Sequence, residues 1–199
     1  MNEAQMKEFL LQALEHELGG IKVYEMALTC ALNDGLRKEW EKYLEETQHH
    51  AEVLTEVCQE LGIDPGRQSP GRTLVSKMGQ MFVAAMSEAL SKDTPEAAEL
   101  VACECVVLAE TKDHLNWELI GKCAQKLGGD QGAKLKAAYE EIEDQEDEHL
   151  YHSKGWCREL WTKALGMPAV LPPPEEERNA KSAVAAAKAE KQSEKGRFH

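Results

Sequence analysis

Residues 139–156 read YEEIEDQEDEHLYHSKGW, and their charges pose the question that decides the fold. Seven of the nine residues from Glu140 to Glu148 are acidic, and His149 and His152 follow them. A helix normally avoids such a run, because like charges three or four positions apart repel one another. Either the run is a solvated face, or part of its charge is there to hold a cation.

The apolar spacing around this run favours a cation for two of its side chains. Glu146 and His149 lie three residues apart, so they project from the same side of a helix. That side also carries the apolar residues of the segment, which are Leu135, Tyr139, Ile142 and Leu150. Because an apolar stripe faces the core, we expect Glu146 and His149 to point inward and the other acidic residues to stay in solvent.

Two other expected helices carry a glutamate on an apolar side. The helical neighbours of Glu17 are apolar or small apart from one tyrosine, and those of Glu104 are apolar apart from one threonine. Glu110 lies nearer Asp113 and His114, which makes it the weaker candidate. A lone buried carboxylate is costly or takes up a proton, so three in one core need positive charge. No Lys or Arg lies on these stripes, and metal ions are the expected compensation.

The helix expected over residues 36–61 should supply a matching pair of ligands, and two registers are open. Glu46 and His49 have the same three-residue spacing as the pair above. The apolar stripe of this helix instead includes His50 and places Thr47 where a carboxylate would be expected. We favour His50 as the inward histidine, with Glu46 as the best available carboxylate. Oxygen ligands combined with imidazole suit iron or manganese.

The composition and net charge exclude several classes of protein. The chain has 199 residues, of which 42% are hydrophobic and 30% charged, so we expect one soluble globular domain. Its net charge of −13 argues against a surface for nucleic acid or an anionic membrane. The N-terminus lacks the pattern of a signal peptide, and no apolar run reaches the roughly 18 residues of a membrane span. We expect a cytoplasmic protein whose six scattered cysteines are reduced thiols.

The spacing of the apolar residues is helical throughout, so we expect an all-α protein. Four long helices are expected, over residues 3–32, 36–61, 95–127 and 133–165. The short links within the first and the last pair make each pair an antiparallel hairpin. The link between the pairs is long and carries its own helix, over residues 73–90. The predicted fold is an antiparallel four-helix bundle with a long crossover that carries an extra short helix.

The bundle is expected to occupy residues 1–168, and residues 169–199 form a low-complexity C-terminal tail. The tail is dominated by Ala, Lys and Glu and has almost no large apolar side chains. Such a segment cannot bury enough surface to pack well, so we expect it to be mobile or weakly helical.

The candidate ligands resemble those of the ferritin-like superfamily of di-iron carboxylate proteins, which includes ferritins, bacterioferritins and rubrerythrins. That superfamily takes one Glu from each of two helices and a Glu-x-x-His motif from each of the other two. The matching residues here are Glu17 and Glu104 as the single glutamates, Glu146 with His149 as one pair, and Glu46 with His49 or His50 as the other. The resemblance covers about residues 8–165 of the chain.

The resemblance implies a dinuclear site of two iron ions, or of manganese, bridged by carboxylates and histidines. Its partners would be metal ions and O2 or peroxide, and its chemistry that of a ferroxidase or of an oxidoreductase that reduces O2 or peroxide. Two alternatives stay open: a non-catalytic helical protein with a degenerate metal site that acts through a partner, and a di-iron hydroxylase of an organic substrate. The long tail and the extra methionine-rich helix make a monomer or homodimer a better match than a cage.

Overall fold

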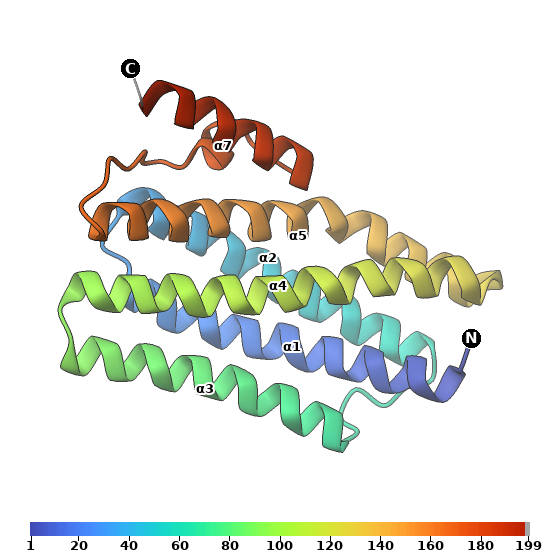
Figure 1. Cartoon of the computed structure of the whole chain (residues 1–199). Helices are drawn as coiled ribbons and strands as arrows, with labels where there is room; N and C mark the ends of the chain where they lie inside the picture. Colours follow the sequence, from blue (N-terminus) through green and yellow to red (C-terminus); the bar gives the residue numbers. More distant parts are fainter. Residues whose placement is uncertain (198–199) are drawn as a thin grey trace.

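The structure, a computed structural model, describes residues 1–197 and confirms that the chain is all-α (Figure 1). Seven helices lie within these residues, and no strand does. They are α1 (Glu3–Cys30), α2 (Asp34–Glu60), α3 (Pro70–Lys92), α4 (Pro95–Leu127), α5 (Gly129–Ala164), α6 (Pro174–Glu177) and α7 (Ala183–Arg197). None of the seven combines the length and the apolar character that a membrane crossing requires.

Local sequence chemistry sets where the long helices begin. A polar side chain directly before each of α1 to α4 accepts a hydrogen bond from a backbone N–H group of the first turn. These capping residues are Asn2, Asn33, Ser69 and Thr94. α5 has no side-chain cap and begins at Gly129, earlier than the expected residue 133. Gly128 and Gly129 have φ angles of 67° and 58°, which glycine adopts without strain, and they reverse the chain within two residues.

The helices α1 to α5 run alternately in opposite directions along the length of the molecule (Figure 1). α1, α2, α5 and α4 contact one another in that cyclic order and so surround a common interior. α3 is the helix expected in the crossover, and it packs on the outside of α1 and α4. Because α3 traverses the bundle, α4 starts at the same end as α2 and runs antiparallel to α1. This arrangement brings Trp117 of α4 to Glu17 of α1, and Glu110 to Tyr24.

The apolar core is divided into two clusters, one toward each end of the bundle. On α1, for example, one cluster takes buried residues between Met6 and Leu14, and the other takes those between Val23 and Cys30. The stretch between the two clusters carries buried polar side chains on all four helices. The main ones are Glu17, Thr47, His50, Glu110, Asp113, Glu146 and His149. A layer of buried charge therefore crosses the middle of an otherwise apolar bundle.

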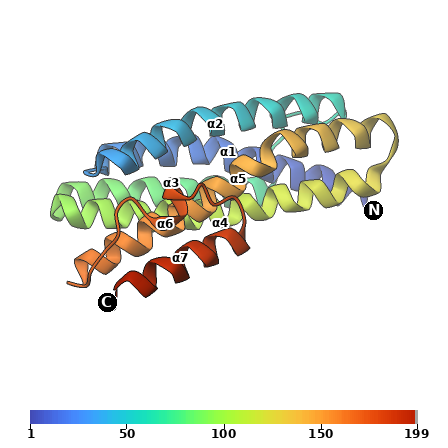
Figure 2. The same ribbon diagram turned by 90° about the horizontal axis from the view of Figure 1, so that it is seen from above.

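The C-terminal segment packs along the outer side of α5 (Figures 1 and 2). The guanidinium of Arg158 donates two hydrogen bonds to the carboxylate of Glu175, at 2.6 Å and 2.9 Å. Ala180 and Ala189 are 1% exposed, so their small side chains are covered. Residues 198 and 199 lie outside the described chain. The separation of a bundle at residues 1–168 from a mobile tail at 169–199 stays a prediction.

Candidate metal centre

The buried polar layer brings five potential metal ligands together from four helices. Glu17 comes from α1, His50 from α2, Glu110 from α4, and Glu146 and His149 from α5. Their exposed fractions run from 0% for Glu17 and His50 to 4% for Glu110. Water cannot solvate charge at these positions, so the charge must be neutralised from within the protein.

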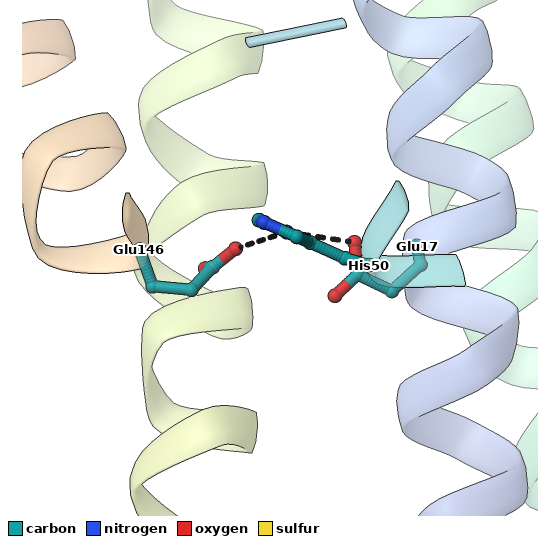
Figure 3. Close-up of side chains that lie close together, drawn as sticks. All are labelled: Glu17, His50 and Glu146. Atoms are coloured by element: carbon teal, nitrogen blue, oxygen red, sulfur yellow. Dashed lines mark ion pairs between the residues drawn. The ribbon is translucent and has the colours of Figure 1, made fainter. Parts of the chain in front are cut away.

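The first of two ligand groups consists of Glu17, His50 and Glu146. The two carboxylates reach the His50 ring from opposite sides (Figure 3). Nδ1 of His50 lies 2.9 Å from Oε1 of Glu146 and 3.8 Å from Oε2 of Glu17. One ligand atom from each of the three residues lies within 4.8 Å of the others, which is close enough for them to share one ion.

The second group consists of Glu110, Glu146 and His149, and it shares Glu146 with the first. Nδ1 of His149 lies 3.6 Å from Oε2 of Glu110 and 3.9 Å from Oε1 of Glu146. The rings of His149 and His50 stack with their centroids 5.6 Å apart. The two groups are therefore adjacent, and the Glu146 carboxylate lies where it can bridge them.

The outer atoms of these ligands are held by hydrogen bonds from the surrounding residues. Trp117 Nε1 donates to Oε1 of Glu17 at 2.7 Å, and the Tyr24 hydroxyl donates to Oε1 of Glu110 at 2.7 Å. Each histidine ring is fixed in the same way through Nε2. The partner oxygens are Gln145 Oε1 for His50 and Glu46 Oε2 for His149, each at 2.8 Å. Hydrogen bonds of this kind orient metal ligands in proteins.

The inner atoms have no hydrogen-bond partner. These atoms are Oε2 of Glu17, Glu110 and Glu146, and Nδ1 of His50 and His149. The His50 ring is neutral and its Nε2 donates to Gln145, so its Nδ1 presents a lone pair to the carboxylate oxygens. Two lone-pair acceptors that face each other in a buried site repel one another unless a proton or a cation lies between them. The donor set of oxygen and imidazole nitrogen fits a transition-metal ion in this position.

Protons take that place when no cation is bound. Burial, with the charge of Asp113, holds the pKa values of Glu17 and Glu146 well above their usual range. Burial and the charge of His149 lower the pKa of His50 to about 4. Binding of a metal ion would displace protons from the two carboxyls, because metal binds the ionised form.

Glu110 and His149 form an oppositely charged pair in the absence of a cation. Burial alone would lower the pKa of His149, but the negative charge of Glu110 and the hydrogen bond and charge of Glu46 raise it to about 9. Burial likewise opposes ionisation of Glu110, yet the positive charge of His149 and the hydrogen bond from Tyr24 lower its pKa. The proton on His149 is another one that a metal ion would displace.

The structure separates the two candidate histidines of α2. His50 is 0% exposed and belongs to the first group, as expected for the inward histidine. The side chain of His49 is 48% exposed, and its Nε2 lies 2.7 Å from Oε1 of Glu141 on the surface. Glu46 is half-buried and touches the outer nitrogen of His149. Thr47, 3% exposed, occupies the inward position at which a carboxylate would complete the motif.

The expectation that Glu104 points into the bundle is wrong. Glu104 is exposed, and its Oε1 accepts a hydrogen bond from Trp161 Nε1 at 2.7 Å. Glu110, six residues later, is the inward glutamate of α4. The error arises because α4 contacts α1, α3 and α5, so apolar residues surround most of its circumference. The inward side of α4 is better indicated in the sequence by three polar residues spaced three apart, Glu110, Asp113 and Asn116. All three are buried on one side of the helix.

A further acidic group, missed from the sequence, lies beside the C-terminal segment. Glu39, Glu148 and His152 place one ligand atom each within 4.8 Å of the others. Glu148 is already neutralised, because it binds Lys42 and also lies 3.3 Å from the ammonium of Lys181. Lysine ammonium groups therefore neutralise this group, whereas the central groups rely on protons.

Comparison with known proteins finds no family model, no curated protein and no solved structure that matches this chain. The class of the protein is therefore defined by its own fold and site. It is an all-α protein whose buried glutamate and histidine side chains form two adjacent groups able to hold a metal ion.

Proposed function

We propose that the chain is a ferritin-like protein with a dinuclear iron or manganese centre, and that it reduces O2 or peroxide or oxidises ferrous iron. The observation that carries the proposal is the convergence of five unpartnered inner atoms from four helices. Buried polar atoms are normally hydrogen-bonded, so five orphans in one place require a common explanation. Metal ions would supply it, by replacing the protons that otherwise neutralise these groups.

The arrangement favours two ions over one. Each group has its own glutamate and its own histidine, and only Glu146 belongs to both. Two divalent ions also match the charge better, because Asp113 adds a buried carboxylate to the three central ones. Iron would supply the electrons for reduction of O2 or peroxide. The protein holds the ligands in place through Trp117, Tyr24 and Gln145, and an apolar cluster lies on either side of the centre.

The space beside the centre favours a small oxidant over an organic substrate. The pocket that reaches Glu146 has a volume of about 160 Å³. Sites for drug-sized organic ligands usually enclose about 300–1,000 Å³. O2 and peroxide fit the smaller volume, whereas the substrate of a hydroxylase would need a larger one.

A binding-only protein is the second candidate, and Thr47 favours it. This buried residue stands where the resemblance leads us to expect a carboxylate, so one ion would have fewer anionic ligands. Such a centre could hold a metal without redox turnover. The protein would then have a structural role or act through a binding partner.

The test compares two glutamates of the same helix. Metal-free wild type, Glu110→Gln and the matched control Glu104→Gln are titrated with Fe²⁺ without oxygen and then mixed with O2 or peroxide. Wild type and the control should bind Fe²⁺ and develop a ferric absorption band. Glu110→Gln should lose most of both signals. Binding without any response to either oxidant would favour the binding-only candidate.

A further inference from the structure

A pocket between α4 and α5 joins the protein surface to the buried centre. It is lined by His114, Trp117, Glu118, Tyr139, Glu143, Glu146 and Asp147. Glu118 and Glu143 are exposed, whereas Trp117 and Glu146 are 1% exposed. The pocket therefore extends from solvent to a carboxylate that both ligand groups share.

The inner wall of the pocket is part of the proposed centre itself. The Glu146 side chain is almost fully buried, and its Oε2 has no hydrogen-bond partner. Trp117, beside it, donates a hydrogen bond to Glu17 at 2.7 Å. A cation that reaches the floor of the pocket thus meets Glu146, a residue of both ligand groups.

The mouth of the pocket is acidic. Asp147 lies 2.7 Å from Nε2 of His114, and its side chain is 23% exposed. Glu143 is exposed one turn earlier on the same helix. Glu118 is paired with the ammonium of Lys122 and contributes less, whereas His114, the partner of Asp147, is charged only when protonated. Glu143 and Asp147 are therefore the two carboxylates that a cation would meet first.

We propose that this pocket is the entry route for divalent metal ions, with Glu143 and Asp147 as transient ligands at its mouth. The inference rests on the proposed function, because it needs a centre that takes up metal. A cleft lined by one sign of charge concentrates counter-ions and speeds their association. The route therefore acts on the rate of loading, whereas Glu17, Glu110, Glu146 and the two histidines set the number of ions held.

A second groove offers a control of the same charge. It lies between α1 and α2 and has a volume of about 550 Å³. Its lining includes two exposed glutamates, Glu52 and Glu56. None of its lining residues is one of the five central ligands. Neutralising Glu52 and Glu56 also removes two negative charges from the chain, but it leaves the pocket between α4 and α5 unchanged.

The experiment measures the rate at which Co²⁺, added alone, enters the metal-free protein in a stopped-flow spectrometer. The double variant E143Q/D147N should load at least about 10-fold more slowly than wild type at low salt, with the same final stoichiometry. E52Q/E56Q should load like wild type. Added salt should reduce the difference, because it screens exposed charges.

Three outcomes would overturn the inference or its basis. Equal loading rates for E143Q/D147N and E52Q/E56Q would show that ions enter elsewhere. A reduced stoichiometry in E143Q/D147N would make the two residues permanent ligands and not a route. A wild-type chain that takes up neither Co²⁺ nor Fe²⁺ would contradict the proposed function itself.

Discussion

Replacing Glu146 with glutamine should stabilise the metal-free protein while it removes a proposed metal ligand. Burial, with the charges of Asp113 and Glu17, holds the pKa of Glu146 well above its ordinary value of 4.5. The native state keeps a proton that the unfolded chain releases, so folding becomes less favourable as the pH rises above 4.5. Glutamine has the same shape and no proton to lose. Its amide can also donate to Nδ1 of His50, which lies 2.9 Å from Glu146 Oε1.

The size of the effect follows from proton linkage. For each pH unit over which only the native state holds the proton, the free energy of unfolding of wild type falls by about 1.4 kcal/mol. The advantage of Glu146→Gln should be near zero below pH 4.5. It should then grow to about 2.7 kcal/mol over the next two pH units while the native carboxyl stays protonated.

Urea unfolding of chelator-treated protein at a series of pH values measures this difference. Glu45→Gln is the control, because Glu45 is exposed on α2 and its replacement should leave the pH dependence unchanged. Added Fe²⁺ should stabilise wild type and not Glu146→Gln. The reasoning is refuted if metal-free Glu146→Gln is less stable than wild type across the series, since Glu146 would then be ionised and stabilising.

Three further predictions concern the surroundings of the centre. His50→Ala should weaken Co²⁺ binding by more than about 100-fold in calorimetric titration, because His50 faces the ligand groups. His49→Ala should change the affinity by less than about 3-fold, because His49 lies on the surface. The reverse order would instead make His49 the ligand, in the Glu46-x-x-His49 register. Trp117→Phe removes the hydrogen bond to Glu17 and should lower the affinity by about 10- to 100-fold at unchanged stoichiometry, and an unchanged affinity would show that Trp117 does not position Glu17. Removal of residues 175–199 should leave the metal content intact, because the five central ligands lie between residues 17 and 149; a loss of bound metal, measured by elemental analysis, would tie the segment to the centre.

The inward residues of α2 and α5 could be predicted from the sequence because each helix has one clear apolar side. Glu146 and His149 share the stripe of Ile142, and His50 shares the stripe that holds Leu54. On such a helix the position of a polar residue within the stripe fixes its direction. The choice of His50 over His49 follows from this geometry alone.

The inward residue of α4 could not be found in the same way. α3 covers one side of α4, and apolar side chains such as Leu108, which is 55% exposed, lie on its outer surface as well. The neighbours of Glu104 are therefore apolar although Glu104 faces outward. The hydrogen bond from Tyr24 to Glu110 is also invisible in the sequence, because it depends on the antiparallel packing of α1 and α4.

The most direct test of the proposed dinuclear centre is the number of metal ions that each chain holds. Iron, manganese and zinc are measured by elemental analysis of wild-type protein purified without chelator and then reloaded with Fe²⁺ under anaerobic conditions. The proposed function predicts two ions per chain, because two ligand groups share Glu146, and a loss of both in Glu146→Gln. A wild-type chain without metal, or a stoichiometry that Glu146→Gln leaves unchanged, would contradict the centre described above.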